Sequence, residues 1–333
     1  MLSRRGLLAI VQALTTVVSG CVRNIRVPTV LPIQPALTLD EIVARVNRYA
    51  QQNTISAPVS LQFRDLRGAS IGKNKQYPAA DARLILKRPE FIRLQVKVPV
   101  VGKKVADMAS NGEKFQLQVF YPEDKRRMIV GTNAGHYKRV EADAQSSDPE
   151  LQRAGTLANI RPQHLTDAFL IEPVALDGAQ RIYFLDEVRQ VEHDTRPTAT
   201  KSDEVERRYY VLTLLERIDG GGEARVVRRI WFDRTRGGTP LARQDIYEDG
   251  RAATLVTYDD FFALSSGDTW AGRVHIERIL DGYSVEVLFN HQDIEINGDV
   301  PETAFQLDNS LHLPEIDLDR MPDVVERNKA VAH

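Results

Sequence analysis

The stretch Ile92-Arg93-Leu94-Gln95-Val96-Lys97-Val98 decides the fold class, because apolar and polar side chains alternate strictly along it. A period of two places the apolar side chains on one face of a β-strand. The same alternation recurs on both sides of this stretch, at Val59, Leu61 and Phe63, at Ala82, Leu84 and Leu86, and at Phe115, Leu117, Val119 and Tyr121. Asn111-Gly112, between two of these runs, is a strong hairpin signal. Residues 58–131 therefore predict an antiparallel meander with one apolar face.

Two short amphipathic segments are available to cover that face. The first begins at the capping box Thr38-Leu39-Asp40-Glu41 and extends to about residue 52 with apolar side chains at helical spacing. The second spans roughly residues 162–171, where Leu165, Phe169 and Leu170 share one face. Further strands are expected between residues 182 and 289, separated by glycine-containing turns, whereas the polar stretch 192–207 reads as a loop. Because an antiparallel sheet must bury its apolar side, the sequence predicts a mainly β, α+β fold.

The first 20 residues have the layout of an export signal. Arg4 and Arg5 precede a mostly apolar run that is too short to span a bilayer. The run ends in Val18-Ser19-Gly20-Cys21, which resembles the lipobox of bacterial lipoproteins, and Cys21 is the only cysteine of the chain. Residues 1–20 are thus predicted to be a lipoprotein signal peptide and Cys21 the lipidation site, carrying chains such as palmitate. The alternative is a conventional signal peptide with a chance cysteine.

The rest of the chain divides into three parts. Residues 21–37 contain three prolines and are predicted to be an extended tether between the lipid and the domain. Residues 38–310 form the predicted domain, and residues 311–333 a polar, loosely packed C-terminal tail. Val22 follows the lipidated cysteine where inner-membrane lipoproteins commonly carry aspartate, so the resemblance favours the outer membrane, facing the periplasm.

Charge excludes one class of function. Lys+Arg number 44 and Asp+Glu 46, so the chain lacks the basic excess of an electrostatic nucleic-acid binder. The sequence contains no nucleophile elbow, phosphate loop or zinc-spaced cluster. We therefore expect neither catalytic residues nor a cofactor or metal, and we do not expect an enzyme. His291, Asp293 and Glu295 would share one face of a strand, where they either form a solvated outer face or, less favourably, reach a metal.

Several motifs together resemble the LolA/LolB-like superfamily of periplasmic lipoprotein carriers and acceptors. Residues 88–94, Arg-Pro-Glu-Phe-Ile-Arg-Leu, resemble the family's entry into a strand, and residues 107–112 resemble its next hairpin. Residues 231–238 resemble a later strand and turn, and Asn297-Gly298-Asp299-Val300-Pro301 resembles its closing segment. The resemblance implies an antiparallel incomplete β-barrel, or half-barrel, whose concave face is covered by helices.

The resemblance also implies a ligand. Family members enclose an apolar cavity for acyl chains, and the apolar side chains of the meander are the candidates to line it: Ile92, Leu94, Val96, Phe115, Leu117 and Val119. The connection Pro99-Val100-Val101-Gly102 resembles the protruding loop of the LolB acceptor, so it is a candidate membrane-contact loop. A plain hairpin tip with a partly buried Val101 is the other interpretation.

These expectations define two functions to be separated. The first is a membrane-anchored periplasmic lipoprotein that binds lipid or lipoprotein acyl chains and acts as an acceptor in lipoprotein transport to the outer membrane. The second is a structural or sensory envelope lipoprotein that binds a protein partner. A hydrolase at the cell envelope is supported only by the predicted location.

Overall fold

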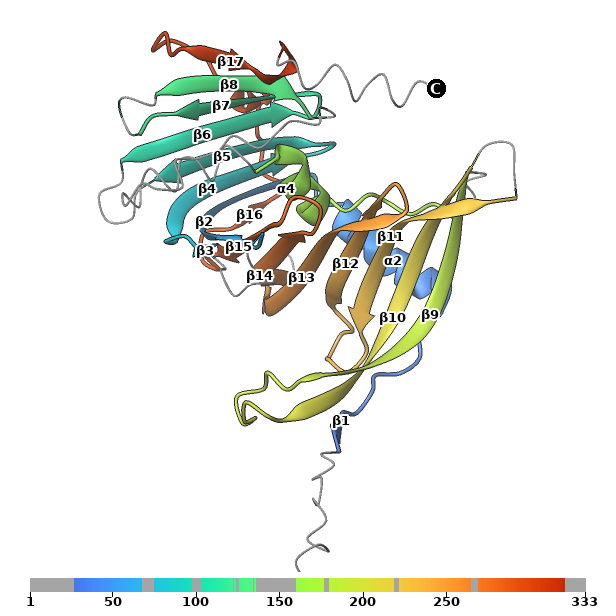
Figure 1. Cartoon of the computed structure of the whole chain (residues 1–333). Coiled ribbons are helices and arrows are strands. Elements are labelled where there is room, and N and C mark those ends of the chain that lie inside the picture. The colour runs from blue at the N-terminus through green and yellow to red at the C-terminus, as the bar shows by residue number, and fades with distance from the viewer. Residues whose placement is uncertain are drawn as a thin grey trace, which may run out of the picture.

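The computed structural model describes residues 27–67, 75–97, 103–121, 123, 126–133, 135, 160–176, 180–218, 222–264 and 269–320. The predicted signal peptide, Cys21, the loop Pro99 to Gly102 and residues 321–333 lie outside the described residues. What the structure describes is one long, strongly curved sheet with two short helices, α2 and α4, against it (Figure 1).

The first half of the sheet is the predicted meander. Its strands are β2 (Thr54–Asp65), β3 (Lys75–Gln76), β4 (Ala80–Lys87), β5 (Phe91–Lys97), β6 (Lys104–Asn111), β7 (Lys114–Val119) and β8 (Arg127–Thr132), whereas the short β1 (Thr29–Val30) pairs with β10 in the second half. In β5 the alternation places Ile92, Leu94 and Val96 in the core. At the hairpin between β6 and β7, Gly112 has φ +92° and the Asn111 Oδ1 accepts hydrogen bonds from the backbone N–H groups of Glu113 and Lys114. The predicted meander and hairpin are therefore confirmed.

The second half continues the same sheet. Its strands are β9 (Arg181–His193), β10 (Glu204–Arg217), β11 (Ala224–Asp233), β12 (Leu241–Glu248), β13 (Arg251–Ala263), β14 (Thr269–Arg278), β15 (Tyr283–Phe289), β16 (Glu295–Ile296) and β17 (Glu315–Asp317). The spatial order along the main sheet is β9-β10-β11-β12-β13-β14-β15-β2-β4-β5-β6-β7-β8-β17. In the described part of the chain β9 and β17 do not pair with each other, so the sheet curves without closing. This confirms the expected incomplete barrel.

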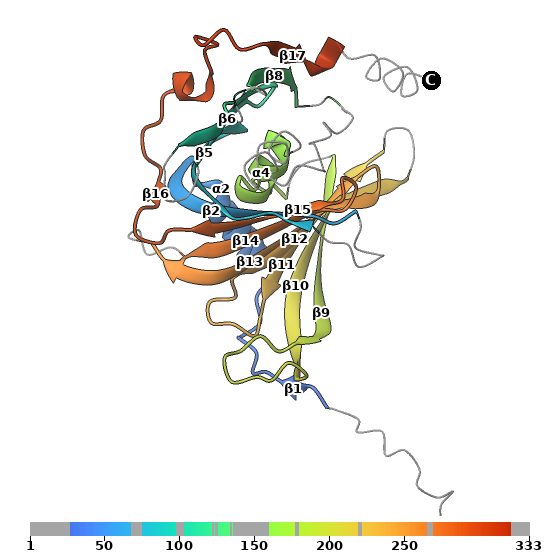
Figure 2. The same ribbon diagram turned by 60° about the vertical axis from the view of Figure 1, so that its left-hand side comes forward.

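Both helices pack on the apolar side of the sheet. α2 (Leu39–Ala50) starts with the predicted capping box, in which Thr38 and Glu41 bond each other's backbone N–H groups, and it buries Ile42, Val43 and Val46. α4 (Pro162–Phe169) lies in the concavity between the two arms of the sheet (Figure 2). The buried side chains of both helices and of the strands belong to one continuous core.

Three sequence expectations are corrected at the margins of the domain. The loop expected at 192–207 is shorter than predicted: residues 194–203 form it, while the flanking residues belong to β9 and β10, where Arg207 pairs with Asp233 of β11 at 3.0 Å. The start of the expected tail joins the sheet, since β17 pairs in parallel with β8 and Leu313 and Leu318 are buried. Residues 27–37, the described part of the expected tether, also contact the domain, because β1 pairs with β10.

The expected strand face of His291, Asp293 and Glu295 is wrong. Residues 290–293 form a turn in which the Asn290 side chain donates a 2.7 Å hydrogen bond to Asp293, and the His291 ring stacks on Phe262. Within the described ranges, no group of three His, Cys, Asp or Glu side chains is placed to hold a metal ion. Those ranges also contain no helix with the length and apolar character needed to cross a membrane.

Candidate functional site

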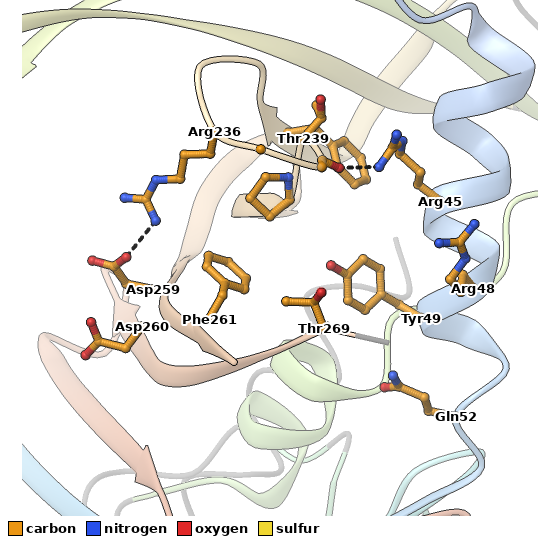
Figure 3. Close-up of a pocket in the computed structure, with 14 residues that line it drawn as sticks. Arg45, Arg48, Tyr49, Gln52, Arg236, Thr239, Asp259, Asp260, Phe261 and Thr269 are labelled. Carbon is orange, nitrogen blue, oxygen red and sulfur yellow. Dashed lines mark hydrogen bonds and ion pairs between the residues drawn. The ribbon is translucent and has the colours of Figure 1, made fainter. Parts of the chain in front are cut away.

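A pocket of about 540 Å³ opens between α2 and the ends of β11, β13 and β14 (Figure 3). This volume lies within the roughly 300–1,000 Å³ range of small-molecule sites. The lining residues are Arg45, Arg48, Tyr49, Gln52, Phe232, Arg236, Gly237, Gly238, Thr239, Pro240, Asp259, Asp260, Phe261 and Thr269. Side chains from α2 thus face a wall built by the turn between β11 and β12 and by strand residues of β11, β13 and β14.

The position of α2 is fixed by reciprocal hydrogen bonds. The Asn47 side chain donates a 2.9 Å bond to the Val174 carbonyl and accepts a 2.7 Å bond from the Val174 backbone N–H. On the pocket side, Arg45 donates to the Gly238 carbonyl in the turn between β11 and β12. α2 is therefore tied to Val174 on one side and to the turn between β11 and β12 on the pocket side, and these bonds fix the width of the pocket.

Apolar groups form one side of the pocket. Phe232, Pro240 and Phe261 come from the sheet, and Tyr49 comes from α2. Tyr49 and Phe261 also line a second, apolar hollow of about 20 Å³ beneath, together with Ala168, Phe169, Ile171, Leu241, Tyr258, Trp270, Ala271 and Val274. That volume holds about one water molecule. The polar pocket and the apolar hollow therefore adjoin at two aromatic side chains.

Charged groups surround the mouth of the pocket. On the sheet side, Arg236 pairs with Asp259 at 2.7 Å and Arg273 pairs with Asp260 at 2.8 Å. Burial alone would raise the pKa of Asp259, but the hydrogen bond and charge of Arg236 help to outweigh it, and the pKa lies below its ordinary value. Asp259 is thus ionised, and both acidic side chains of this wall have arginine partners.

Two buried polar atoms near the pocket have no hydrogen-bond partner among the residues that the structure describes. They are the Gln52 Oε1 and the Trp270 Nε1, in side chains of residues only 7% and 5% exposed. Buried polar atoms are nearly always paired, because leaving one unpaired costs about 1–3 kcal/mol. Gln52 lines the polar pocket and Trp270 the apolar hollow, so a bound molecule has both an acceptor and a donor to satisfy.

The sequence candidates lie elsewhere or outside the described residues. None of the six expected cavity-lining side chains lines the pocket described above. All of them are buried in the main core and are between 0% and 5% exposed: Ile92, Leu94, Val96, Phe115, Leu117 and Val119. Their contact with an acyl chain stays a prediction. Cys21 and the loop Pro99, Val100, Val101 and Gly102 lie outside the described residues.

The pocket residues were missed because they come from separate parts of the chain. Arg45 and Arg48 stand one turn apart on the polar side of α2, a signal that the sequence does contain. What the sequence could not reveal is that the turn at residues 236–240 and residues 259–261 of β13 face this helix. Polar side chains on a predicted helix read as a solvated surface until a second wall is found.

No protein-family model matches the sequence, and no curated protein sequence matches it. The fold is similar to that of a LolA superfamily protein, NE2245 from Nitrosomonas europaea, with 14% identity and a TM-score of 0.40, covering 82% of this chain and 100% of the other.

Two further structures are similar in fold. One is an outer membrane lipoprotein-sorting protein domain from Vibrio parahaemolyticus, with 11% identity, a TM-score of 0.40 and coverage of 80% of this chain and 95% of the other. The second is a DUF1329 family protein from Desulfovibrio piger, with 11% identity, a TM-score of 0.43 and coverage of 80% of this chain and 94% of the other.

Proposed function

We propose that the protein is a membrane-anchored envelope lipoprotein that binds an acyl chain of a lipid or lipoprotein in the pocket between α2 and the β11–β14 wall. The observation that carries the proposal is the junction of a polar pocket with an apolar hollow at Tyr49 and Phe261. An amphiphile needs this combination, because its chain gains about 0.8 kcal/mol per buried CH₂ while its headgroup stays in contact with water.

The apolar hollow supplies the path for the chain. In the structure it is nearly filled, so a chain enters by turning Tyr49 and Phe261, both only partly buried, away from the junction. Ala168 and Ala271 are the smallest side chains that line the hollow, together with Phe169. Since α4 contacts β5 and β6, a longer chain passing beneath it reaches the apolar face that carries Ile92, Leu94, Val96, Phe115, Leu117 and Val119.

Anchoring is the second part of the proposal. Lipid on Cys21 would hold the domain at the outer membrane, with the pocket in the periplasm. The tether begins to dock at residues 29–30, so the free linker is shorter than its sequence suggests. An anchored protein with an acyl pocket fits an acceptor for lipoproteins better than a soluble shuttle, and the loop Pro99 to Gly102 is proposed to meet the membrane during transfer.

The experiment uses the chain's own fluorescence. Of the two tryptophans, Trp270 lines the hollow, whereas Trp231 donates to Asp245 in a separate small cluster. In a Trp231→Phe background, dodecanoate is expected to change the Trp270 emission in a saturable manner. Protein purified without its signal peptide is also expected to carry lipid detectable by mass spectrometry.

A matched pair of variants makes the test specific. Ala271→Leu fills the hollow and is expected to lower the affinity for dodecanoate about tenfold or more, since it removes the space for several CH₂ groups. Ala252→Leu adds the same volume on β13 outside the pocket lining and is expected to leave binding unchanged. No saturable response in the parent protein and no copurified lipid would exclude the proposed function.

A second function is favoured by one specific observation. β9 is a 13-residue edge strand, and along the described chain its outer edge pairs with no other strand, while Phe184 and Val191 on it are 57% and 53% exposed. Long apolar edge strands offer a template for a partner's strand. A photocrosslinker at Phe184 that captures one envelope protein, in a chain that binds no lipid, would support a structural or sensory role instead.

A further inference from the structure

The two walls of the pocket differ in how their charges are neutralised. On the sheet wall the acidic Asp259 and Asp260 both have arginine partners. On the helix wall, neither Arg45 nor Arg48 forms an ion pair with any residue that the structure describes. The charge of Arg45 helps to lower the pKa of Glu41 one turn earlier on α2, but the two side chains form no ion pair, so the helix wall presents two positive charges to the pocket.

The two arginines are placed to act on one group. They stand at positions i and i+3 of α2, which separates their Cβ atoms by about 5–6 Å on the same side of the helix. Arg45 is held by its bond to the Gly238 carbonyl, which leaves further N–H donors of its guanidinium available (Figure 3). Arg48 is exposed and lines the pocket. A phosphate or carboxylate between them would accept charge-assisted hydrogen bonds from both.

A third group on the same wall adds to this specificity. Gln52 lies four residues after Arg48, just beyond the end of α2. Figure 3 shows its side-chain amide directed toward the pocket, below Tyr49. The Gln52 Oε1 is buried without a partner, so it calls for a hydrogen-bond donor on the ligand. From its mouth toward the interior, the pocket thus presents the positive charges of two arginines, the hydrogen-bond acceptor of Gln52 and then the apolar hollow.

We infer that the ligand is an anionic amphiphile, whose phosphate or carboxylate binds Arg45 and Arg48 and whose chain passes Tyr49 into the apolar hollow. A hydroxyl or N–H of its headgroup donates to the Gln52 Oε1. The arginines of the opposite wall are neutralised by Asp259 and Asp260, so that wall attracts an anion less than α2 does, and the headgroup is oriented toward α2. This inference rests on the proposed function and specifies the class of its ligand.

The test compares headgroups on one chain length. In the Trp231→Phe background, we expect dodecanoate and dodecyl phosphate to bind about tenfold more tightly than dodecyl maltoside, and dodecyltrimethylammonium more weakly still. Arg48→Gln is expected to remove most of the preference for the anions, Arg48→Lys to retain part of it, and Arg45→Gln to act like Arg48→Gln. Arg251→Gln, at an exposed arginine outside the pocket lining, should change nothing.

Two sources of the anion are separated in the same assay. Short-chain phosphatidylglycerol tested against short-chain phosphatidylcholine examines a phospholipid, and the fatty acid examines a free carboxylate; a preference for either anion supports the inference. Equal affinity for anionic, neutral and cationic amphiphiles, unchanged in Arg48→Gln, overturns it while the proposed function stands. If none of the amphiphiles binds, the proposed function fails and the inference with it.

Discussion

The Arg88 guanidinium donates a 2.9 Å hydrogen bond to the carbonyl oxygen of Ile171, just beyond the end of α4. The same side chain donates to the carbonyls of Gln52 (2.9 Å) and Tyr49 (3.4 Å) at the end of α2. The last carbonyls of a helix have no partner within the helix and carry partial negative charge. One arginine at the end of β4 therefore ties both covering helices to the sheet and holds the end of α2 that lines the pocket.

Arg88→Ala is expected to lower the free energy of unfolding by about 2–4 kcal/mol, because it leaves carbonyls of two helix ends without their donor. Arg88→Lys keeps the charge but not the forked geometry, so we expect an intermediate loss. Urea unfolding followed by circular dichroism measures both. Arg251→Ala, at an exposed arginine, should stay within about 0.5 kcal/mol of the parent. An unchanged midpoint for Arg88→Ala would contradict the bridging role.

The motif around Arg88 shows what the sequence could and could not reveal. Alternation at Ile92 and Leu94 predicted the strand, because the pattern is local and one face is buried. The role of Arg88 depends on two helix ends that lie far away along the chain, so no local pattern contains it. The same holds for the pocket, whose walls meet only through the curvature of the sheet.

The errors at the margins have a related cause. Glu204–Arg207 read as a loop because three of its four side chains are charged, yet cross-strand charge pairs and the buried Val205 and Arg207 give it strand structure. β17 read as a tail because its pairing with β8 is parallel and non-local. Periodicity detects strands that cover a core and misses strands that extend beyond it.

Cys21→Ser is expected to abolish incorporation of radioactive palmitate and to release the protein from the membrane fraction, because it removes the only thiol that can carry lipid. Gly20→Ala keeps a small residue before the cysteine and should still be labelled. Labelling and fractionation of cells expressing the full chain measure both effects. Palmitate retained in Cys21→Ser would contradict lipidation at this residue.

Leu117→Ala tests whether long chains reach the face of β5 and β7. Leu117 is 2% exposed, so the substitution should cost about 2–5 kcal/mol of stability, and binding is measured at a temperature where both proteins are folded. We expect palmitate to lose affinity and octanoate to keep it, because only the longer chain passes beneath α4. Leu214 on β10 is 4% exposed, so Leu214→Ala is the control. We expect it to cause a similar loss of stability without making the loss of affinity depend on the length of the ligand's chain. Equal effects on both chains would place the ligand entirely in the α2 pocket.

Asp167 on α4 makes stability depend on pH. Burial raises its pKa from 3.8 to about 6, with Arg228 opposing the shift and Glu90 and Glu172 adding to it. Between these two values the folded protein binds a proton that the unfolded chain has already released. The free energy of unfolding therefore falls as the pH rises from about 4 through about 6, and above that range the full penalty of the buried charge, on the order of 1–3 kcal/mol, is present.

Asp167→Asn keeps the shape of the side chain and removes its charge, so we expect it to stabilise the protein at neutral pH and to have little effect near pH 4, where Asp167 is protonated in the folded protein. The difference between variant and parent isolates this group from buried His164, whose lowered pKa makes stability fall in the opposite direction, as the pH drops below about 6.5. Urea midpoints measured across this pH range give the difference directly. A constant difference at all pH values would show that Asp167 does not titrate with a raised pKa, and that its carboxylate is instead hydrated at the edge of α4.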